Sequence, residues 1–164
     1  MDDRAIVERQ LGRAPRAFGR VVVRCPYGMP VVTEQLPYDD RGEPFPTTYY
    51  LTCRHLVAAI ARIEAAGGVE RWSRAVAEDD ELATSVALAT EEQRRVRHAL
   101  AGAVRGIDEG ASLDSGIGGS QTPHQLKCLH AHAAYALARP GYLLGDRILD
   151  EVSELWPTDA CCSE

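Results

Sequence analysis

Apolar and polar residues change their spacing near residue 54, and this change divides the chain into two kinds of structure. Before that point, β-branched and aromatic residues stand in short runs between prolines, glycines and acidic turns: residues 18–25, 31–36 and 47–53. Short runs of this kind joined by turn residues predict an antiparallel β-meander. A short helix, capped by Asp2 or Asp3 and ending near Leu11, precedes the meander.

From His55 onward, apolar residues recur at helical spacing. This spacing predicts helices over residues 55–66, 69–77, 79–104, 122–139 and 146–155, with a glycine- and serine-rich loop over 106–121. We therefore expect one α+β domain, in which a short N-terminal antiparallel meander packs on a mostly helical remainder. Its parts are an N-terminal helix, the meander, the helical part and a polar tail: residues 1–16, 17–53, 54–156 and 157–164.

Composition narrows the classes of function. A net charge of −6 over 164 residues argues against a nucleic-acid partner, which needs a basic surface. No run of apolar residues approaches the 18 that would suggest a membrane span, so we expect no membrane partner. The first residues lack the basic-then-apolar order of a signal peptide, which predicts a cytoplasmic protein.

The stretch 122–139 is the most informative segment. Thr122 is a good N-cap, Pro123 suits the first helical position, and Gln125 completes a capping box. On such a helix one side is apolar and the opposite side carries Cys128, His132 and Tyr135. A helix of this kind is expected to be covered on both sides. Cys128 and His132 are an i, i+4 pair, so their side chains can reach one point.

Two further cysteines end predicted strands, Cys25 and Cys53. If these strand ends meet the central helix, they bring three thiols to one imidazole, a set that can bind zinc or hold an iron–sulfur cluster. The metal ligands would be Cys25, Cys53, Cys128 and His132. The alternative is that the three cysteines are buried as small apolar side chains.

A basic residue adjoins each of these cysteines: Arg24, Arg54 and Lys127. Such cations favour thiolates and could bind a small anionic ligand, although simple surface charge is the favoured interpretation. For a catalytic role the candidates are Cys128, His130 and Tyr50. His130 falls on the apolar side of the predicted helix, so a core histidine is favoured over a ligand.

Two features remain open from the residues alone. The segment Ser115-Gly-Ile-Gly-Gly119 could bind an anion through backbone amides, but a flexible connector is the favoured interpretation. Cys161 and Cys162 stand in the polar tail and are either incidental or redox-active.

The chain resembles a bacterial family of unknown function, number 501, in three blocks: Arg24-Cys-Pro-Tyr-Gly-Met-Pro30, Pro44-Phe-Pro-Thr-Thr-Tyr-Tyr-Leu-Thr-Cys53 and Lys127-Cys-Leu-His-Ala-His132. The resemblance runs from about Phe18 to Gly145 and implies that Cys25, Cys53 and Cys128 are family positions. The family usually has proline where this chain has Arg54, and an Asn-Pro pair where it has Leu143-Leu144. Family members are encoded near an exopolyphosphatase-like phosphatase and a septum-formation protein.

The resemblance favours a metal-binding protein, with an iron–sulfur cluster slightly preferred over zinc because the family places proline after both strand cysteines. Whether it is an enzyme stays open. One alternative is an accessory protein of cell division or phosphate metabolism, with a structural zinc and a protein partner. The other is a metal-free enzyme with a cysteine nucleophile.

Overall fold

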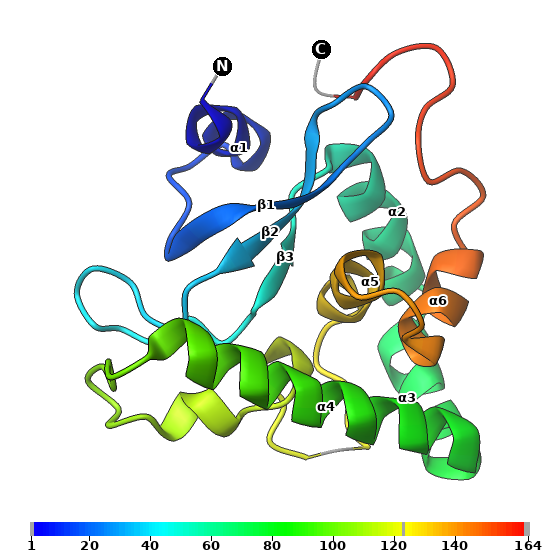
Figure 1. The fold of residues 1–164 in the computed structure, drawn as a ribbon. Helices are drawn as coiled ribbons and strands as arrows, with labels where there is room; N and C mark the ends of the chain where they lie inside the picture. Colours follow the sequence, from blue (N-terminus) through cyan, green and yellow to red (C-terminus); the bar gives the residue numbers. More distant parts are fainter. Residues whose placement is uncertain (1, 123, 163–164) are drawn as a thin grey trace.

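The computed structural model describes residues 2–122 and 124–162, and it confirms an α+β fold with a three-stranded antiparallel sheet near the N-terminus (Figure 1). The helices and strands follow in chain order: α1 (Asp3–Leu11), β1 (Phe18–Arg24), β2 (Pro30–Gln35), β3 (Tyr49–Leu51), α2 (Arg54–Ala65), α3 (Gly68–Glu78), α4 (Asp80–Ala101), the 3₁₀ turns η1 (Ala111–Asp114) and η2 (Ile117–Gly119), α5 (Leu129–Ala138) and α6 (Leu143–Asp150).

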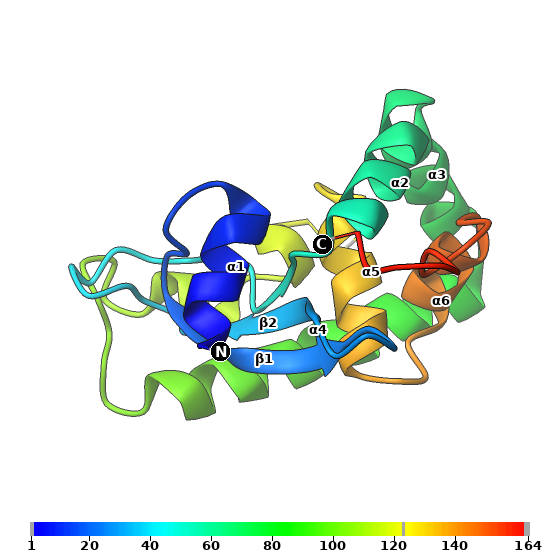
Figure 2. The same cartoon turned by 90° about the horizontal axis from the view of Figure 1, so that it is seen from above.

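The sheet has the order β1-β2-β3, as a meander requires. Val32 of the middle strand lies opposite Val23 on one side and Leu51 on the other. All six residues of β2 are buried, and since side chains alternate between the faces of a strand, both faces are covered. Helix α1 contacts β1 and β2, while α5 contacts all three strands and chiefly β3 (Figure 2).

Helix α5 lies in the middle of the molecule, between the sheet and the helices α2 and α6 (Figure 1). Seven of its ten residues are buried, so the expectation of a helix covered on both sides is confirmed. Its alanines allow close neighbours. A methyl group placed on Gly145 of α6 would lie 2.5 Å from the Cβ atom of Ala136, so the two helices touch almost backbone to backbone.

The predicted start of this helix at Thr122 is wrong, because the helix begins only at Leu129. Pro123 lies outside the described residues. Leu126 is buried in the core, and its amide donates to the hydroxyl of Ser73 on α3 instead of to a helical carbonyl. The hydroxyl of Ser120 donates to backbone carbonyl groups of the same turn. These tertiary and turn hydrogen bonds replace the capping box.

Other helix ends follow local signals more closely. Asp2 and Asp79 cap α1 and α4, each accepting backbone amides in the first turn. The last helix was predicted over 146–155, but α6 covers Leu143–Asp150. The residues beyond it do not continue the helix: Glu151 is held by the indole of Trp72 on α3, and the carbonyl of Glu154 bonds to the ring of His55. The predicted connector 106–121 contains the two 3₁₀ turns.

None of the helices that the structure describes has the length and apolar character needed to cross a bilayer.

Candidate metal centre

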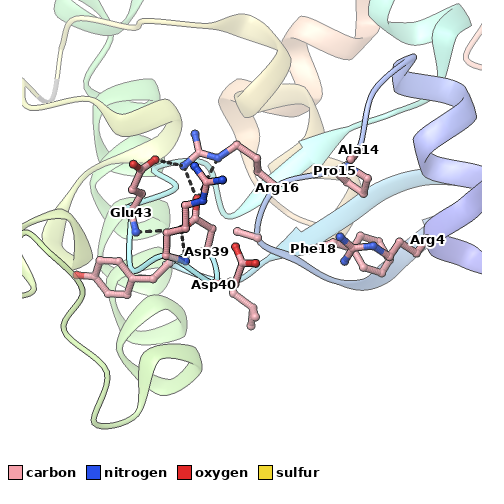
Figure 3. Close-up of a pocket in the computed structure, with 12 residues that line it drawn as sticks. Arg4, Ala14, Pro15, Arg16, Phe18, Asp39, Asp40 and Glu43 are labelled. Atoms are coloured by element: carbon pink, nitrogen blue, oxygen red, sulfur yellow. Dashed lines mark hydrogen bonds and ion pairs between the residues drawn. The ribbon is translucent and has the colours of Figure 1, made fainter.

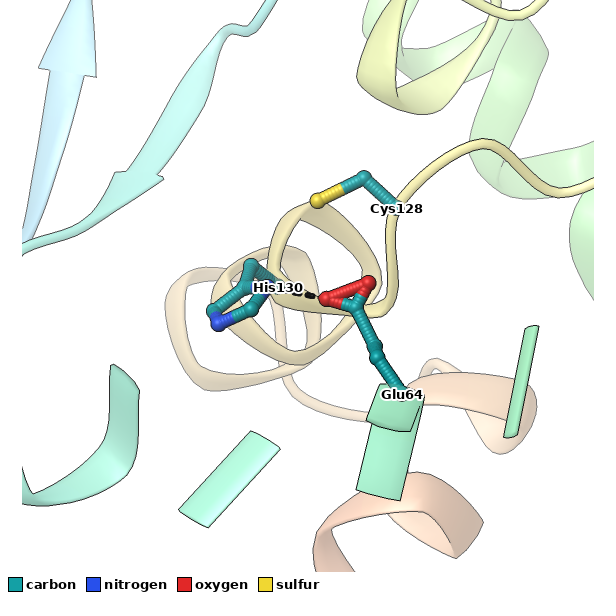
Figure 4. A group of neighbouring side chains, drawn as sticks. All are labelled: Glu64, Cys128 and His130. Carbon is teal, nitrogen blue, oxygen red and sulfur yellow. Dashed lines mark ion pairs between the residues drawn. The ribbon is translucent and has the colours of Figure 1, made fainter. Parts of the chain in front are cut away.

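Three potential ligands from two helices meet beside the N-terminus of α5 (Figure 4). Glu64 lies in the last turn of α2, Cys128 is the N-cap residue of α5, and His130 lies in its first turn. Each offers one ligand atom, and these atoms all lie within 4.8 Å of one another. Within residues 2–122 and 124–162, no other group of three or more histidine, cysteine or acidic side chains meets this condition.

The imidazole of His130 is oriented through both of its nitrogen atoms. Nδ1 lies 2.5 Å from Oε1 of Glu64, and Nε2 lies 3.0 Å from the backbone carbonyl oxygen of Val57, two turns earlier on α2. An Nε2–H group that donates to a carbonyl leaves Nδ1 facing the carboxylate and the thiol. Protein ligands to metals use this arrangement, in which the second ring nitrogen donates to a carbonyl or carboxylate group.

Without a metal, the same contacts hold a proton on the ring. Burial by itself would lower the pKa of His130, but hydrogen bonds to Cys128 and the Val57 carbonyl, with the charges of Cys128 and Glu64, raise it to about 9. The metal-free ring is therefore an imidazolium at neutral pH. The side chains of His130 and Glu64 remain 25% and 24% exposed, so an ion can reach the group from solvent.

The predicted ligand set of three cysteines and His132 is not assembled in the structure. Because α5 begins only at Leu129, Cys128 has an extended backbone (φ −152°) and does not share a helical face with His132. His132 is 2% exposed, and its Nδ1 lies 2.7 Å from the hydroxyl of Tyr142. Burial lowers the pKa of His132 to about 4, so the ring is neutral. It is a core histidine, the role expected for His130.

Cys25 and Cys53 do lie at strand ends, as predicted, but they meet the tail instead of α5. The Sγ atom of Cys25 lies 4.0 Å from that of Cys161, and the Sγ atom of Cys53 lies 3.6 Å from that of Cys162. Cys25 and Cys53 are buried.

The basic residues beside the predicted cysteine ligands serve elsewhere or face solvent. Arg24 pairs with Asp3 of α1 at 2.7 Å. Arg54 donates to the carbonyl groups of Arg9 and Gln10, where α1 ends. Lys127 is exposed. The two arginines therefore attach α1 to the rest of the fold.

Tyr50 is half-buried, and its hydroxyl accepts a hydrogen bond from Arg13 at 3.2 Å. Its neighbour Tyr49 is buried against Tyr135 of α5, so Tyr50 occupies the face of β3 turned away from α5. Tyr50 is thus not part of the group at Cys128. The loop over 115–119 does approach Cys128, since a Cβ atom placed on Gly118 would lie 3.8 Å from the Cβ of Cys128.

A hollow of about 720 Å³ lies elsewhere, between α1, β1 and the turn after β2 (Figure 3). Three of its charged side chains are paired with one another: Arg16 contacts Asp39 at 2.8 Å and Glu43 at 3.4 Å. No cysteine or histidine is among the described residues that line it. The described part of its wall therefore offers neither a thiol nor an imidazole.

Sequence reasoning missed Glu64. Glu64 is the one acidic residue of the predicted helix 55–66, but 64 positions separate it from Cys128. Val57 and Glu64 are seven residues apart and so face the same side of α2, which was the one available signal. Nothing in the sequence shows that this side meets α5.

The fold and the site define a small α+β protein with a carboxylate–thiol–imidazole group between two helices. A family model described as "Protein of unknown function (DUF501)" matches residues 21–150, so the chain belongs to this family and the resemblance is confirmed. Glu64, Cys128 and His130 all lie within the matched region, whereas Cys161 and Cys162 lie beyond it. No curated protein and no solved structure matches the chain.

Proposed function

We propose that this protein binds a single divalent metal ion through Glu64, Cys128 and His130, with one coordination position left for water or a substrate. The observation that carries the proposal is the convergence of the three ligand atoms within 4.8 Å, on an imidazole whose other nitrogen is held by a carbonyl group. Three protein ligands and an open position are typical of catalytic zinc sites.

The chemistry of the donors selects the metal. One thiolate, one imidazole and one carboxylate suit Zn²⁺ or Fe²⁺, whereas an iron–sulfur cluster is held mainly by several cysteine thiolates. This site supplies only one thiol, so it favours zinc over the cluster that the sequence slightly favoured. An ion bound here would act as a Lewis acid and would make its bound water more acidic.

Little movement is required for binding. Metal–ligand bonds of about 2.0–2.3 Å at tetrahedral angles place neighbouring donor atoms roughly 3.3–3.8 Å apart. The contact of 2.5 Å between Nδ1 of His130 and Oε1 of Glu64 would therefore open by about 1 Å. Glu64 can supply this by side-chain rotation, since it lies in the last turn of α2 and is partly exposed. The ion would replace the proton on Nδ1 and leave the bond to Val57 intact.

Of the three basic residues proposed to bind a small anionic substrate, Arg24 and Arg54 are bonded to α1, so Lys127, which is exposed beside Cys128, is the remaining candidate. We further propose a cytoplasmic location, because a thiolate ligand persists in a reducing compartment. The absence of a membrane-crossing helix among the described residues is consistent with it.

The test is a titration of chelator-treated protein with Co²⁺, which reports thiolate ligation and coordination number by absorption. Substitutions Cys161→Ser and Cys162→Ser in the background remove the tail thiols as competing ligands. We expect one ion per chain, and at least about 100-fold weaker binding in Glu64→Gln, Cys128→Ser and His130→Gln, which is more than the loss of a residue that only orients a ligand costs. His124→Gln, an exposed histidine, is the matched control and should bind as the parent does.

Circular dichroism of each variant checks that a loss of binding is not a loss of folding. Binding that is absent from the parent, or equal in all variants, would refute the proposal. Rapid alkylation of Cys128 in a parent that binds no metal would instead support a metal-free cysteine nucleophile.

A further inference from the structure

Four of the five cysteines gather at one edge of the sheet, away from the group at Cys128. Cys25 follows β1 and Cys53 follows β3, while the other two come from the tail. They form two pairs with Sγ–Sγ distances of 4.0 Å for Cys25 and Cys161 and 3.6 Å for Cys53 and Cys162. All four line one small cavity of about 10 Å³.

Sheet topology explains why the thiols meet in pairs. Strands β1 and β3 both run antiparallel to β2, so they are parallel to each other and end at the same edge of the sheet. Because β2 separates them, their backbones lie about 10 Å apart. The tail crosses this edge and places one thiol against each strand end. Among the described residues, no third thiol lies within 4.8 Å of both members of either pair.

The distances and the surroundings fit metal ligation. Both Sγ–Sγ distances exceed the bond length of about 2.05 Å in a disulfide. They match the separation of about 3.8 Å between two thiolates on one tetrahedral metal, which follows from metal–sulfur bonds of about 2.3 Å.

The rest of the cavity wall is mostly apolar, with Met29, Trp156 and Pro157 among its members, and none of the described residues that line it is charged. A bound cation would supply the positive charge that several thiolates need here.

We propose that Cys25, Cys53, Cys161 and Cys162 form a second metal centre, ligated entirely by thiolates, which fastens the tail to the sheet edge. Two pairs set apart by a strand fit a two-iron, two-sulfide cluster with one pair on each iron. A single zinc would use the same four ligands after the pairs approach. Either occupant needs more room than about 10 Å³, so the tail moves outward as the centre is loaded.

Anaerobic purification, followed by elemental analysis, sulfide assay and an absorption spectrum, tests the proposal. The parent for this test carries Cys128→Ser, which disables the site of the proposed function. We expect this parent to retain either two irons with two sulfides, or one zinc. Adding Cys161→Ser and Cys162→Ser should reduce that metal to background. A second readout is proteolysis of the tail, which should be slow in the loaded parent and fast once a chelator removes the metal.

Three results would overturn the proposal. One is a folded parent without metal, before and after reconstitution with zinc or with iron and sulfide. A second is metal that survives loss of both tail thiols. Disulfides between Cys25 and Cys161 or Cys53 and Cys162 in protein prepared under reducing conditions, detected by mass spectrometry, would also overturn it. Because this parent lacks Cys128, a negative result refutes the thiolate centre without refuting the proposed function. In the same way, the test of the proposed function uses protein without Cys161 and Cys162, so its failure does not refute the thiolate centre.

Discussion

His130 and His132 lie only two residues apart on α5, yet their contributions to the stability of the protein should depend on pH in opposite directions. Burial lowers the pKa of His132 to about 4, whereas the contacts of His130 raise its pKa to about 9, against 6.5 for each in the unfolded chain. Stability due to the neutral His132 is present above pH 6.5 and is lost as pH falls toward 4. Stability due to the charged His130 is present in full below pH 6.5 and is lost as pH rises through 9.

Linkage converts these shifts into free energies of unfolding. Between pH 7.5 and 5.0, His132 alone lowers the unfolding free energy by about 2 kcal/mol, because most of its shift of roughly 2.5 units falls in that window. His130 alone raises it by about 1 kcal/mol over the same window, after a discount for the exposed part of its ring. From pH 7.5 to 5.0, the two histidines together should therefore lower the unfolding free energy of the wild-type protein by about 1 kcal/mol, in addition to the effect of all other titrating groups.

Urea unfolding of metal-free protein at pH 7.5 and 5.0, followed by circular dichroism, measures both effects. His132→Gln keeps an acceptor for Tyr142 but cannot be charged. Relative to wild type, its change in unfolding free energy between the two pH values should be about 2 kcal/mol more favourable. For His130→Gln, the same change in unfolding free energy should be about 1 kcal/mol less favourable than for the wild type. If the unfolding free energies of His132→Gln and the wild type changed equally between the two pH values, the claim that His132 is buried as a neutral ring would be refuted.

Two substitutions test how the helices are held. Gly145→Ala should destabilise the protein by about 2–3 kcal/mol, because the added methyl group would lie 2.5 Å from both the Ala136 Cβ and the His132 carbonyl oxygen. A melting temperature equal to that of the wild type would contradict this contact between α5 and α6. Asp79→Ala should cost about 1 kcal/mol by removing the cap of α4, while Asp79→Asn should cost much less, and equal melting temperatures for these two variants would argue against a capping role.

Local signals predicted much of the fold. The runs at 18–25, 31–36 and 47–53 became β1, β2 and β3, and the acidic cap at Asp79 begins α4. Each of these signals acts between residues close in the chain. The prediction of a helix that starts at Thr122 was wrong because residues outside the segment form the hydrogen bonds there. Ser73 and Ser120 bond to its backbone in place of the expected capping box.

The site was less predictable than the fold. Cys128 and His130 were candidates from the sequence, and the structure brings them together. Their third partner, Glu64, comes from a different helix. The thiols of Cys25 and Cys53 were expected to reach α5, but they contact Cys161 and Cys162 of the tail instead.

The sequence by itself determined the order and type of the elements, because hydrophobic period, caps and turns are properties of neighbouring residues. Only the tertiary structure decided which thiols, imidazoles and carboxylates share a site. That outcome depends on which face of α2 meets α5 and on the edge of the sheet that the tail crosses. Such contacts join residues far apart in the chain, and a periodic pattern carries no information about them.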